Sequence, residues 1–576
     1  MRKTKPDELT RSKPVIREKE LIRCGDGTLE KRKGVYIVHL KGSYEEMGWQ
    51  HGKLAAEVCG DVVVSYFLDV VASLVKHTLP SLAGIVNSLL KWLFYTLNKK
   101  RIGRPLMDQI RGMADALGLS YSANAKGVFV PDILHFLIGK TFPAYIPVPP
   151  SCSGFMARGT ATEGGKLIVG RNFDFFGQGV WDENNALIFL EPEEGQKFCW
   201  IGALGVPASG QGMNESGLIV SMYTKFNRDV RFTGIPLFTL LGNILQKCES
   251  VDDTLKLIAE QPRLCGLSLL VVDSKARDAA VAGFSANNME IVRPEKDVLV
   301  RTNHYTSEKM KKFEVGPYPC VLHSTSRFNR IHSLLEEKRG QLTSSDVPVL
   351  LSDNIDFYEN RQRLAGYIIR ACNNSQSIAF SPDEDAMWIA NGPFPVCTSE
   401  EYMGFRISAL FNRERDMYEI EDLDGAGNMS LSEREAQKHF QEAWTAYFDN
   451  NKDDLAVQYL RKAEECAPEE PVFPRLAGFL LMKRDKFVQA LPFMERNAAY
   501  EYKHDIMKAE ALLWLGRCLD LNGMRNEALE KYRQASEIDV FPVSGAAKKH
   551  LNRPFKRKGL AKVSPEFMVG TVLAKY

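Results

Sequence analysis

The segment of residues 151–174 constrains the fold of this chain more than any other stretch of its sequence. It follows a proline-rich approach and consists of β-type runs separated by a Gly-Gly pair at 164–165. Two strands joined by a glycine turn run antiparallel, so residues near one end of the segment lie opposite residues near the other end. We therefore expect Arg171 and Asp174 to return beside Cys152, which would bring a cation, a carboxylate and a thiol together.

These three groups suit a nucleophile that carries its own base. If the bond between Ser151 and Cys152 is broken, the new α-amino group has a reference pKa of about 7.7 to 8.0 and can take the proton of its own thiol. Asp174 would hold this amine in position, and Arg171 would favour the thiolate. The alternative interpretation is a small buried thiol beside a structural ion pair.

Short β-type runs punctuated by glycine continue from Cys152 to about Tyr418. Helical patterns lie between some of them, at Leu237–Lys247 and Val251–Gln261. Because the strands occur in blocks and the helices are segregated, we expect a layered α+β domain over residues 152–420. The predicted strands include Lys166–Arg171, Ala186–Leu190, Gly217–Met222, Leu267–Asp273 and Met387–Ala390.

The part before Cys152 divides into a charged arm and a mainly helical segment. Residues 1–33 are polar and charged, and we expect a poorly ordered N-terminal arm. Residues 34–151 begin with a strand at Val35–Leu40 and continue as a helical, prosegment-like part of the catalytic domain. Charges and Pro80 interrupt the apolar run Val62–Leu97, so it predicts two helices and no membrane span. A membrane-surface or acyl-binding flap is the alternative interpretation.

The polar stretch after the core is interpreted as a linker over residues 421–433. Asp422, Asp424 and Glu433 lie at several positions of a calcium-loop template, but a turn and a helix cap explain them more simply. At the far end, residues 542–576 carry many lysines and arginines, and we expect a basic tail that is solvated or caps the module. Binding of anionic partners is the alternative interpretation.

Residues 434–541 carry a mild internal repeat of helical pattern. Gly478, Ala490 and Phe493 in one unit recur as Gly516, Ala528 and Tyr532 in the next. This spacing resembles tetratricopeptide repeats, in which glycine lets paired helices approach closely and alanine lies at their contact. A nonrepetitive helical bundle is the alternative interpretation.

Three further motifs follow the 151–174 segment in a fixed order. They are Gly212-Met-Asn-Glu-Ser-Gly-Leu218, Arg301-Thr-Asn-His304 and Ser324-Thr-Ser-Arg-Phe-Asn-Arg330. Together with Arg171-Asn-Phe-Asp174, they resemble the N-terminal-nucleophile hydrolases of the choloylglycine hydrolase and isopenicillin N acyltransferase type. The resemblance covers about residues 35–415, and its helical segment before Cys152 is similar to the acyltransferase branch. The chain departs from many relatives at Ser153, where they have Thr.

The resemblance implies a four-layer αββα sandwich and a set of functional residues. The implied catalytic positions are Cys152, Arg171, Asp174, Asn214, Asn303 and Arg327. Cys152 would be the nucleophile, exposed by cleavage after Ser151. The two asparagines would lie near the reacting carbonyl, and Arg327 would orient the site. Turn-stabilising roles for the asparagines, a surface position for Arg327 and a dyad of His304 with Cys152 stay open as alternatives.

Composition narrows the remaining function classes. The chain has 74 Lys and Arg residues and 72 Asp and Glu residues, which gives a net charge of +2. The chain as a whole therefore has no excess of positive charge that would favour nucleic-acid binding. The 11 cysteines form no metal-type pair and no dense framework, so free thiols in a reducing compartment are expected. With no secretory pattern at the N-terminus, we expect the cytoplasm. No cofactor or metal motif is present in the sequence.

The sequence thus predicts a self-processing cysteine amidase or acyltransferase that acts on linear amide C–N bonds through an S-acyl-Cys152 thioester. Its expected partner is a small-molecule N-acyl amide or acyl donor, and the helical repeats are available to a protein partner. A peripheral membrane contact is compatible with this prediction. The alternative from another class is a non-catalytic ligand-binding or scaffold protein with a degenerate hydrolase domain.

Overall fold

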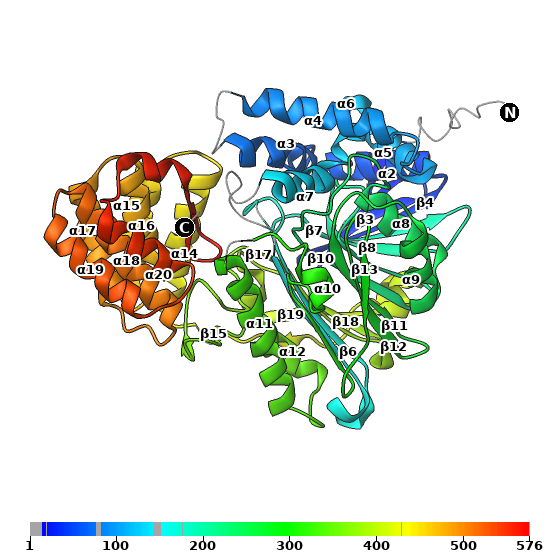
Figure 1. Ribbon diagram of the computed structural model, residues 1–576. Coiled ribbons are helices and arrows are strands. Elements are labelled where there is room, and N and C mark those ends of the chain that lie inside the picture. The colour runs from blue at the N-terminus through cyan, green and yellow to red at the C-terminus, as the bar shows by residue number, and fades with distance from the viewer. Residues whose placement is uncertain are drawn as a thin grey trace.

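The computed structural model describes residues 14–18, 20–76, 82–141, 151–175, 177–316, 318–427 and 429–574. A core of helices and sheets is built from most of the chain, and a helical module lies at one side of it (Figure 1). Two large sheets run through the core, one of eleven and one of seven described strands. The mixed helix-and-sheet class of the core and the helical character of the C-terminal region are confirmed.

The larger sheet joins strands from both sides of Cys152 in the sequence. Its middle holds the parallel pair β4 (Val35–Gly42) and β7 (Asn185–Pro192), whereas its other neighbours are antiparallel. The segment before Cys152 is therefore a structural part of the core. The other strands are β1 (Val15–Glu18), β2 (Leu21–Cys24), β3 (Gly27–Arg32), β8 (Phe198–Ala203), β9 (Gln211–Asn214), β10 (Leu218–Thr224), β11 (Leu267–Asp273), β12 (Asp278–Phe284) and β13 (Met289–Val292).

The smaller sheet carries the candidate nucleophile. Its strands in spatial order are β14 (Val298–Arg301), β5 (Ser151–Ala157), β6 (Ile168–Asp174), β17 (Asn374–Ser381), β18 (Ala386–Ala390), β19 (Glu401–Arg406) and β20 (Leu423–Asp424). Cys152 is the second residue of β5. Because β20 pairs with β19, part of the predicted linker belongs to this sheet.

Buried side chains connect the two sheets face to face. One cluster combines Ile37 and Leu187 of the larger sheet with Val169 and Ile378 of the smaller sheet. The helices α8 (Leu237–Lys247) and α9 (Val251–Glu260) pack on the other face of the larger sheet. On the other face of the smaller sheet lie α11 (Tyr318–Glu337) and α12 (Val347–Leu351). Shorter elements are α10 (Glu308–Lys311), α13 (Ile407–Asn412), β15 (Ile355–Asp356) and β16 (Arg361–Gln362).

In the described part of the chain, six helices precede Cys152. They are α2 (Tyr44–Ala56), α3 (Val62–Lys76), α4 (Ala83–Asn98), α5 (Arg104–Leu117), α6 (Tyr121–Gly127) and α7 (Val130–Thr141). The two helices predicted within Val62–Leu97 are confirmed as α3 and α4. Gly48 of α2 faces α5 so closely that a Cβ atom there would lie 1.9 Å from the carbonyl oxygen of Gln109. The proline-rich approach at 142–150 lies outside the described residues.

The predicted poorly ordered arm is wrong for residues 15–18 and 21–32, which contain β1 to β3 of the larger sheet. Leu21, Cys24 and Leu29 are buried, whereas Arg23 forms an ion pair with Glu18 and Asp26 is exposed. In such short strands the alternation of apolar and polar side chains spans only a few residues, so the many charged residues of the segment obscure it in the sequence. Residues 1–13 lie outside the described part of the chain.

The C-terminal module consists of consecutive helices that pack on their neighbours. Glycine permits close helix contact at two places: a Cβ at Gly478 would lie 2.7 Å from Met494, and a Cβ at Gly516 would lie 2.7 Å from Tyr532. The helices are α14 (Leu431–Phe448), α15 (Asp453–Cys466), α16 (Val472–Lys483), α17 (Phe487–Ala499), α18 (Asp505–Leu521), α19 (Arg525–Glu537) and α20 (Val543–Asn552).

The lysines and arginines of the predicted tail are exposed from Lys548 to Lys558, as expected for a solvated segment, but the tail also contains regular structure that the sequence analysis did not predict. Residues 543–552 form α20, and the strands β21 (Val563–Glu566) and β22 (Thr571–Ala574) form an antiparallel hairpin. Phe567, Met568 and Val569 at its tip are buried. The apolar residues at the tip are buried because apolar side chains of the helical module cover them, and this burial stabilises the hairpin despite the basic residues before it.

The interpretation of the acidic residues between 422 and 433 as part of a turn and a helix cap, rather than a calcium loop, agrees with the structure. Asp422 accepts hydrogen bonds from Lys33 Nζ at 2.5 Å and from the Gly404 backbone nitrogen at 2.8 Å. Ser430 and Glu433 form a capping box at the start of α14. These contacts give the acidic residues structural partners.

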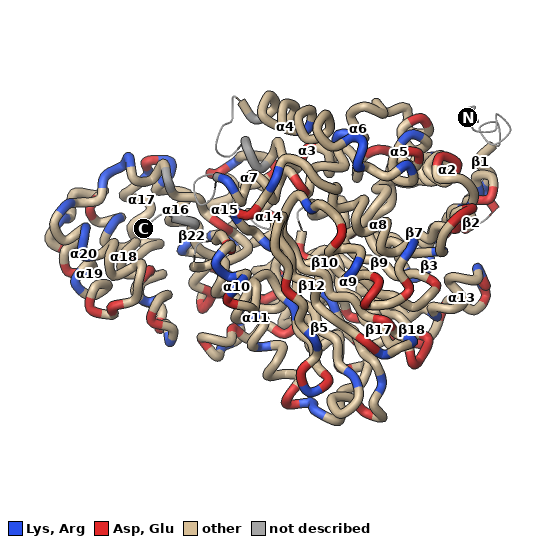
Figure 2. The backbone as a smooth tube through the Cα atoms, turned by 45° about the vertical axis from the view of Figure 1, so that its right-hand side comes forward, with Lys and Arg blue, Asp and Glu red and all other residues tan. Residues whose placement is uncertain are grey.

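Figure 2 shows basic and acidic residues interspersed along the backbone of both the core and the module. None of the helices in the described part of the chain combines the length and apolar character that a membrane crossing requires.

Candidate active site

Cys152 lies on a central strand of the smaller sheet. The strand β5 pairs with β6 on one side and with β14 on the other. The register places Ser151 opposite Asp174 and Cys152 opposite Phe173, so the hairpin predicted for residues 151–174 is confirmed. The Cys152 side chain is fully buried between the two sheets.

A guanidinium group and a backbone carbonyl face the thiol. Cys152 Sγ lies 3.7 Å from Arg171 Nη2 and 3.5 Å from the carbonyl oxygen of Met222. Arg171 Nη2 also donates to that carbonyl at 2.7 Å, and Nη1 donates to the amide oxygen of Gln211. Burial raises the pKa of the Cys152 thiol, and the positive charge of Arg171 counteracts this. In the intact chain the thiol is therefore protonated, next to a group that would stabilise its thiolate.

Asp174 holds the residue before the candidate nucleophile. Its Oδ2 accepts a 2.6 Å hydrogen bond from Ser151 Oγ, and its Oδ1 accepts one of 3.0 Å from Asn374 Nδ2. Burial raises the pKa of Asp174, while Arg327 and these hydrogen bonds act in the opposite direction. The sequence-based expectation placed Asp174 on a free amine of Cys152, but in the intact chain it holds the Ser151 side of the bond.

Asn303 and Arg327 contact the backbone of Cys152 itself. The Cys152 amide donates to Asn303 Oδ1 at 3.0 Å, and Arg327 Nη1 donates to the Cys152 carbonyl oxygen at 2.6 Å. Arg327 is fully buried in α11, so its alternative interpretation as a surface residue is wrong. Asn303 follows β14 by two residues, and this strand pairs with β5 and so places the side chain beside Cys152.

Asn214 does not join this group. Its Nδ2 donates to the carbonyl oxygens of Leu245 and Cys248 at 3.0 and 2.9 Å, and its Oδ1 accepts from the Leu218 backbone at 3.0 Å. Both amide hydrogens are therefore committed to backbone carbonyls at the end of α8. This placement corrects the expectation that Asn214 donates to a reacting carbonyl and agrees with the turn-stabilising alternative.

The alternative dyad of His304 with Cys152 is also not formed. His304 Nδ1 lies 2.9 Å from Ser324 Oγ. Burial lowers the pKa of His304 to about 2, and nearby cations act in the same direction. This histidine is neutral and belongs to a structural network beside Asn303.

Sequence reasoning did not identify several polar residues of the site. Asn303 Nδ2 donates to the carbonyl oxygen and Oγ1 of Thr224, at 3.2 and 3.1 Å. Gln211 accepts from Arg171, and Ser324 Oγ accepts from the Asn303 backbone at 2.7 Å. The only sequence signal is position: Gln211 directly precedes the Gly-Met-Asn-Glu motif, and Thr224 ends the strand that follows it.

Two hollows lie on different sides of the site. The apolar cavity is lined by residues of α3, α7 and the two sheets, among them Phe67, Val70, Leu134, Phe173, Met222 and Thr224. The second pocket is lined among others by Ser151, Phe226, Asn303, Glu314, Arg327 and Met568. Thr224 lines the first and Asn303 the second, and hydrogen bonds join these two residues beside Cys152.

Across the residues that the structure describes, His, Cys, Asp and Glu side chains form no group of three or more that could hold a metal ion. The chemistry available at Cys152 is that of a thiol, two guanidinium groups, a carboxylate and an amide.

A family model and two relatives match parts of the chain. Residues 160–369 match the model described as acyl-coenzyme A:6-aminopenicillanic acid acyl-transferase, a range that includes Arg171 and Arg327 and begins after Cys152. An uncharacterized protein of Archaeoglobus fulgidus is 23% identical over 343 residues, 54% of this chain and 56% of that protein. Protein dcd1B of Dictyostelium discoideum is 22% identical over 291 residues, 48% of this chain and 54% of that protein. The chain thus spans about half the length of these relatives.

Among solved structures, a mutant of the conjugated bile acid hydrolase from Clostridium perfringens aligns with 49% of this chain and 98% of its own, at 12% identity and a TM-score of 0.32. The family model matches less than half of the chain.

Proposed function

We propose that this chain is a self-processing amide hydrolase or acyltransferase with Cys152 as its N-terminal nucleophile. One observation carries the proposal: three buried or half-buried side chains from separate elements contact three different atoms of Cys152. Arg171 contacts the thiol, Asn303 accepts from the amide nitrogen, and Arg327 donates to the carbonyl oxygen. Such convergence on one residue exceeds what a buried structural cysteine needs.

The proposed first step is cleavage of the chain before Cys152. The Cys152 sulfur attacks the carbonyl carbon of Ser151 and a C–S bond forms. The C–N bond to Cys152 breaks as its nitrogen takes up the proton that the thiol gives up. Water then hydrolyses the thioester, which frees the Ser151 carboxylate and leaves Cys152 with a free thiol and α-amino group. Asp174 supports this step because it fixes Ser151 through a 2.6 Å hydrogen bond.

After cleavage, the new α-amino group serves as the base for the Cys152 thiol, with a reference pKa of about 7.7 to 8.0. Asn303 Oδ1, which accepts from this nitrogen in the intact chain, remains in place to orient it. The thiolate attacks the substrate carbonyl, the amine departs with the proton, and an S-acyl-Cys152 thioester remains. Asn303 Nδ2 is the proposed donor to the oxyanion, for which it exchanges one of its two hydrogen bonds to Thr224. Such a contact typically lowers the barrier by about 2.7 to 4 kcal/mol.

The apolar cavity supports an N-acyl amide or another acyl donor as the substrate. Its lining combines Phe67 and Val70 of α3 with Leu134 of α7 and with Met222, whose carbonyl oxygen contacts the Cys152 thiol. An acyl chain in this cavity would bring its carbonyl to the thiol while its methylene groups leave water. Water as the acceptor gives an amidase, and an amine gives an acyltransferase.

The proposed architecture is the four-layer αββα sandwich, extended by strands β1 to β3 and followed by a tetratricopeptide-like module. The clusters on both outer faces and between the sheets support this layering. All 11 cysteines are free in the structure, which supports a reducing compartment such as the cytoplasm.

A peripheral contact with a lipid surface is a further part of the proposal. Ile85, Leu89 and Trp92 are 66%, 56% and 52% exposed, and their spacing places them on one face of α4. Lys99 and Lys100 follow at the end of the helix and are exposed. An apolar face with adjacent lysines suits the interface of a membrane with anionic lipids.

Intact mass measurement of the purified wild type tests the enzyme proposal. We expect two polypeptides that begin at Met1 and Cys152, together with hydrolysis of octanoyl amides. Cys152→Ala should remain one chain without activity, whereas Cys518→Ala, a buried cysteine of the module, should process and hydrolyse like the wild type. An uncut wild type whose amide hydrolysis survives Cys152→Ala would contradict the mechanism, and an uncut, inactive wild type would favour a ligand-binding protein.

A further inference from the structure

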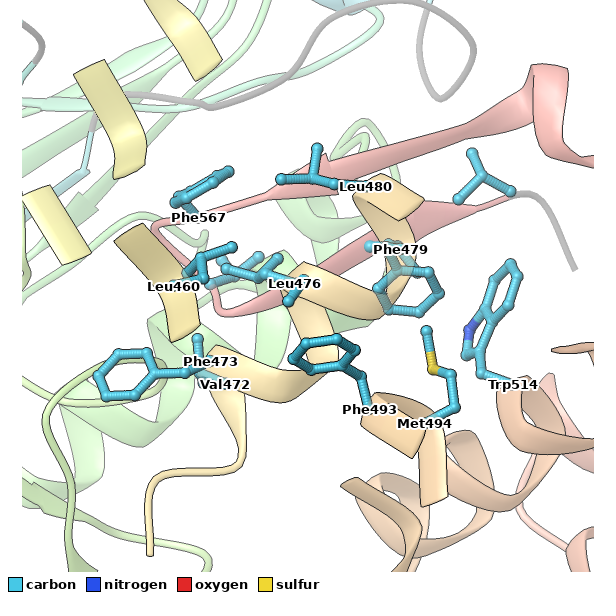
Figure 3. Close-up of a cluster of buried hydrophobic side chains, with 14 of the residues drawn as sticks. Leu460, Val472, Phe473, Leu476, Phe479, Leu480, Phe493, Met494, Trp514 and Phe567 are labelled. Carbon is cyan, nitrogen blue, oxygen red and sulfur yellow. The ribbon is translucent and has the colours of Figure 1, made fainter. Parts of the chain in front are cut away.

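The C-terminal hairpin packs inside the helical module. The Phe567 ring stacks on Phe440 and Tyr447, with centroids 5.6 and 5.2 Å apart, and lies near Leu460 and Leu476 (Figure 3). Arg475 of α16 donates to the Gly570 carbonyl oxygen at 2.9 Å. The tip at 567–570 therefore has a fixed position relative to the module.

The same tip reaches the catalytic core. A Cβ at Gly570 would lie 3.4 Å from the Cα of Gly366, which belongs to the core. Met568 and Val569 line the second pocket together with Ser151. The turn of the C-terminal hairpin therefore builds one wall of a pocket at the candidate nucleophile.

The second pocket is small and mixes apolar and polar groups. Its apolar walls are Phe226, Val315, Val321, Met568 and Val569. Its volume of about 30 Å³ leaves room for about two or three water-sized groups. A ligand group in this pocket would therefore have only a few heavy atoms.

One buried polar atom of the pocket has no partner. His323 Nδ1 lies 3.4 Å from Arg327 Nη2. Because a guanidinium group only donates, Nδ1 accepts, and the ring proton of this neutral histidine is on Nε2. Nε2 is buried and has no hydrogen-bond partner among the described residues, although His323 lines the pocket. An orphaned buried donor beside a hollow indicates a ligand that brings an acceptor oxygen.

We propose that the second pocket holds the amine part of the substrate, and that the C-terminal hairpin sets the size of this part. This inference rests on the proposed function. Thr224 lines the apolar cavity and Asn303 lines the second pocket, and the two side chains are hydrogen-bonded to each other beside Cys152. An amide whose acyl chain fills the apolar cavity therefore directs its nitrogen substituent toward Met568. The occupant is a small amine part with an acceptor oxygen for His323 Nε2.

Octanoyl amides of methylamine, butylamine and hexylamine test the size limit on the processed wild-type protein. We expect kcat/KM to fall as the amine part grows. Met568→Ala enlarges the pocket and should raise the kcat/KM ratio of the butylamide to the methylamide about tenfold, the discrimination that a few methylene groups provide. The preference among acyl chain lengths should stay unchanged in this variant.

Met494→Ala is the matched control, because Met494 is also a buried methionine of the module but packs on Gly478 away from the pocket. It should leave the amine-size ratio at the wild-type value. Leu134→Ala, in the apolar cavity, should change only the preference for acyl chain length. A ratio that stays unchanged in Met568→Ala, or that shifts equally in Met494→Ala, overturns the inference while the proposed function stands. A wild type that hydrolyses none of the amides removes the proposed function and this inference together.

The octanoyl amides of butylamine and methoxyethylamine test the role of His323, since they have the same number of heavy atoms and differ by one ether oxygen. The wild type should prefer the methoxyethylamide, and His323→Leu should abolish that preference, whatever its effect on the overall rate. A preference that survives in His323→Leu would overturn the assignment of this donor to the substrate.

Discussion

Arg327 Nη1 lies 2.6 Å from the carbonyl oxygen of Cys152, although 175 positions separate the two residues in the sequence. The same nitrogen donates to Ser153 Oγ at 2.8 Å, and Nη2 donates to Asn303 Oδ1 at 2.8 Å. One buried guanidinium thus holds both the backbone of Cys152 and the side chain of Asn303, which accepts a hydrogen bond from the Cys152 amide. A planar fork of donors suits this task, whereas a lysine presents a single point charge.

We expect Arg327→Met to slow cleavage before Cys152 about a hundredfold, because displacing reacting groups by about 1 Å has an effect of that size. Arg327→Lys keeps the charge without the fork and should recover only part of the rate. Time-resolved intact mass measurement after pulsed expression gives the cleavage rate. Arg330→Met is the control on the same helix, since it loses a 2.8 Å ion pair with Asp353 and no contact with Cys152. Equal slowing in both variants would leave Arg327 only a structural role.

The hairpin at the site was predictable because its information is local. Two β-type runs and the glycine pair at 164–165 determine that Asp174 returns to Ser151, and the register agrees. The position of Arg327 could not be derived in this way. Its partners on Cys152 and Asn303 lie in other strands, so a polar helix face and a buried guanidinium give the same local pattern.

The regular structure that sequence interpretation missed at the two chain ends has one physical cause. The strands at 15–32 and the hairpin at 563–574 are short, and charged residues surround them. Each is stabilised by a surface contributed from elsewhere: β4 of the larger sheet in the first case and α16 of the module in the second. The local composition of a segment does not reveal such a distant packing partner, so these strands could not be predicted from it.

Asn214→Ala should reduce stability and leave catalysis almost unchanged. The variant removes both donors to the carbonyl oxygens of Leu245 and Cys248, and unpaired buried carbonyls cost about 1 to 3 kcal/mol. Thermal melting and kcat on octanoyl amides separate the two effects. Asn303→Ala is the comparison, with a large loss of kcat expected. A hundredfold loss of kcat in Asn214→Ala at an unchanged melting temperature would return this residue to the catalytic set.

A buried ion pair joins the module to the core. Arg363 Nη2 lies 2.6 Å from Glu470 Oε1, and both side chains are at most 4% exposed. Arg363→Met should lower the free energy of unfolding by about 3 to 5 kcal/mol, because it leaves the Glu470 carboxylate buried without its cation. The double variant Arg363→Met/Glu470→Leu should be more stable than either single variant. Thermal melting of the set of four proteins checks this order, and additive losses would contradict it.

Asp132 predicts a pH dependence of stability. Burial raises its pKa to about 7, against hydrogen bonds from the Leu237 backbone and Cys265. An unfolded aspartate titrates near pH 4, so the folded chain binds the extra proton between about pH 4 and 7. The stability that this proton binding contributes to the folded chain is fully present below about pH 4 and is lost as the pH rises through about 7.

Asp132→Asn removes this titration. Its stability relative to the wild type should therefore increase between pH 5 and pH 8, by at most about 4 kcal/mol. Melting temperatures of both proteins at the two pH values measure the change. Asp416→Asn, at an exposed position, should show the same difference from the wild type at both pH values. A constant difference for Asp132→Asn would show that its carboxyl titrates alike in the folded and unfolded chains.

The exposed face of α4 predicts binding to lipid vesicles that contain phosphatidylserine. Figure 2 shows α4 as a mainly uncharged helix at the edge of the core. Replacing Ile85, Leu89 and Trp92 with serine removes the apolar groups that would enter the interface, and we expect about a tenfold loss in vesicle co-sedimentation. High salt should weaken binding of the wild type, because it screens Lys99 and Lys100. The control variant Val488→Ser/Phe541→Ser removes side chains that are 80% and 85% exposed on the module and should bind like the wild type. Equal binding of the α4 variant and the wild type would exclude this face as the membrane contact.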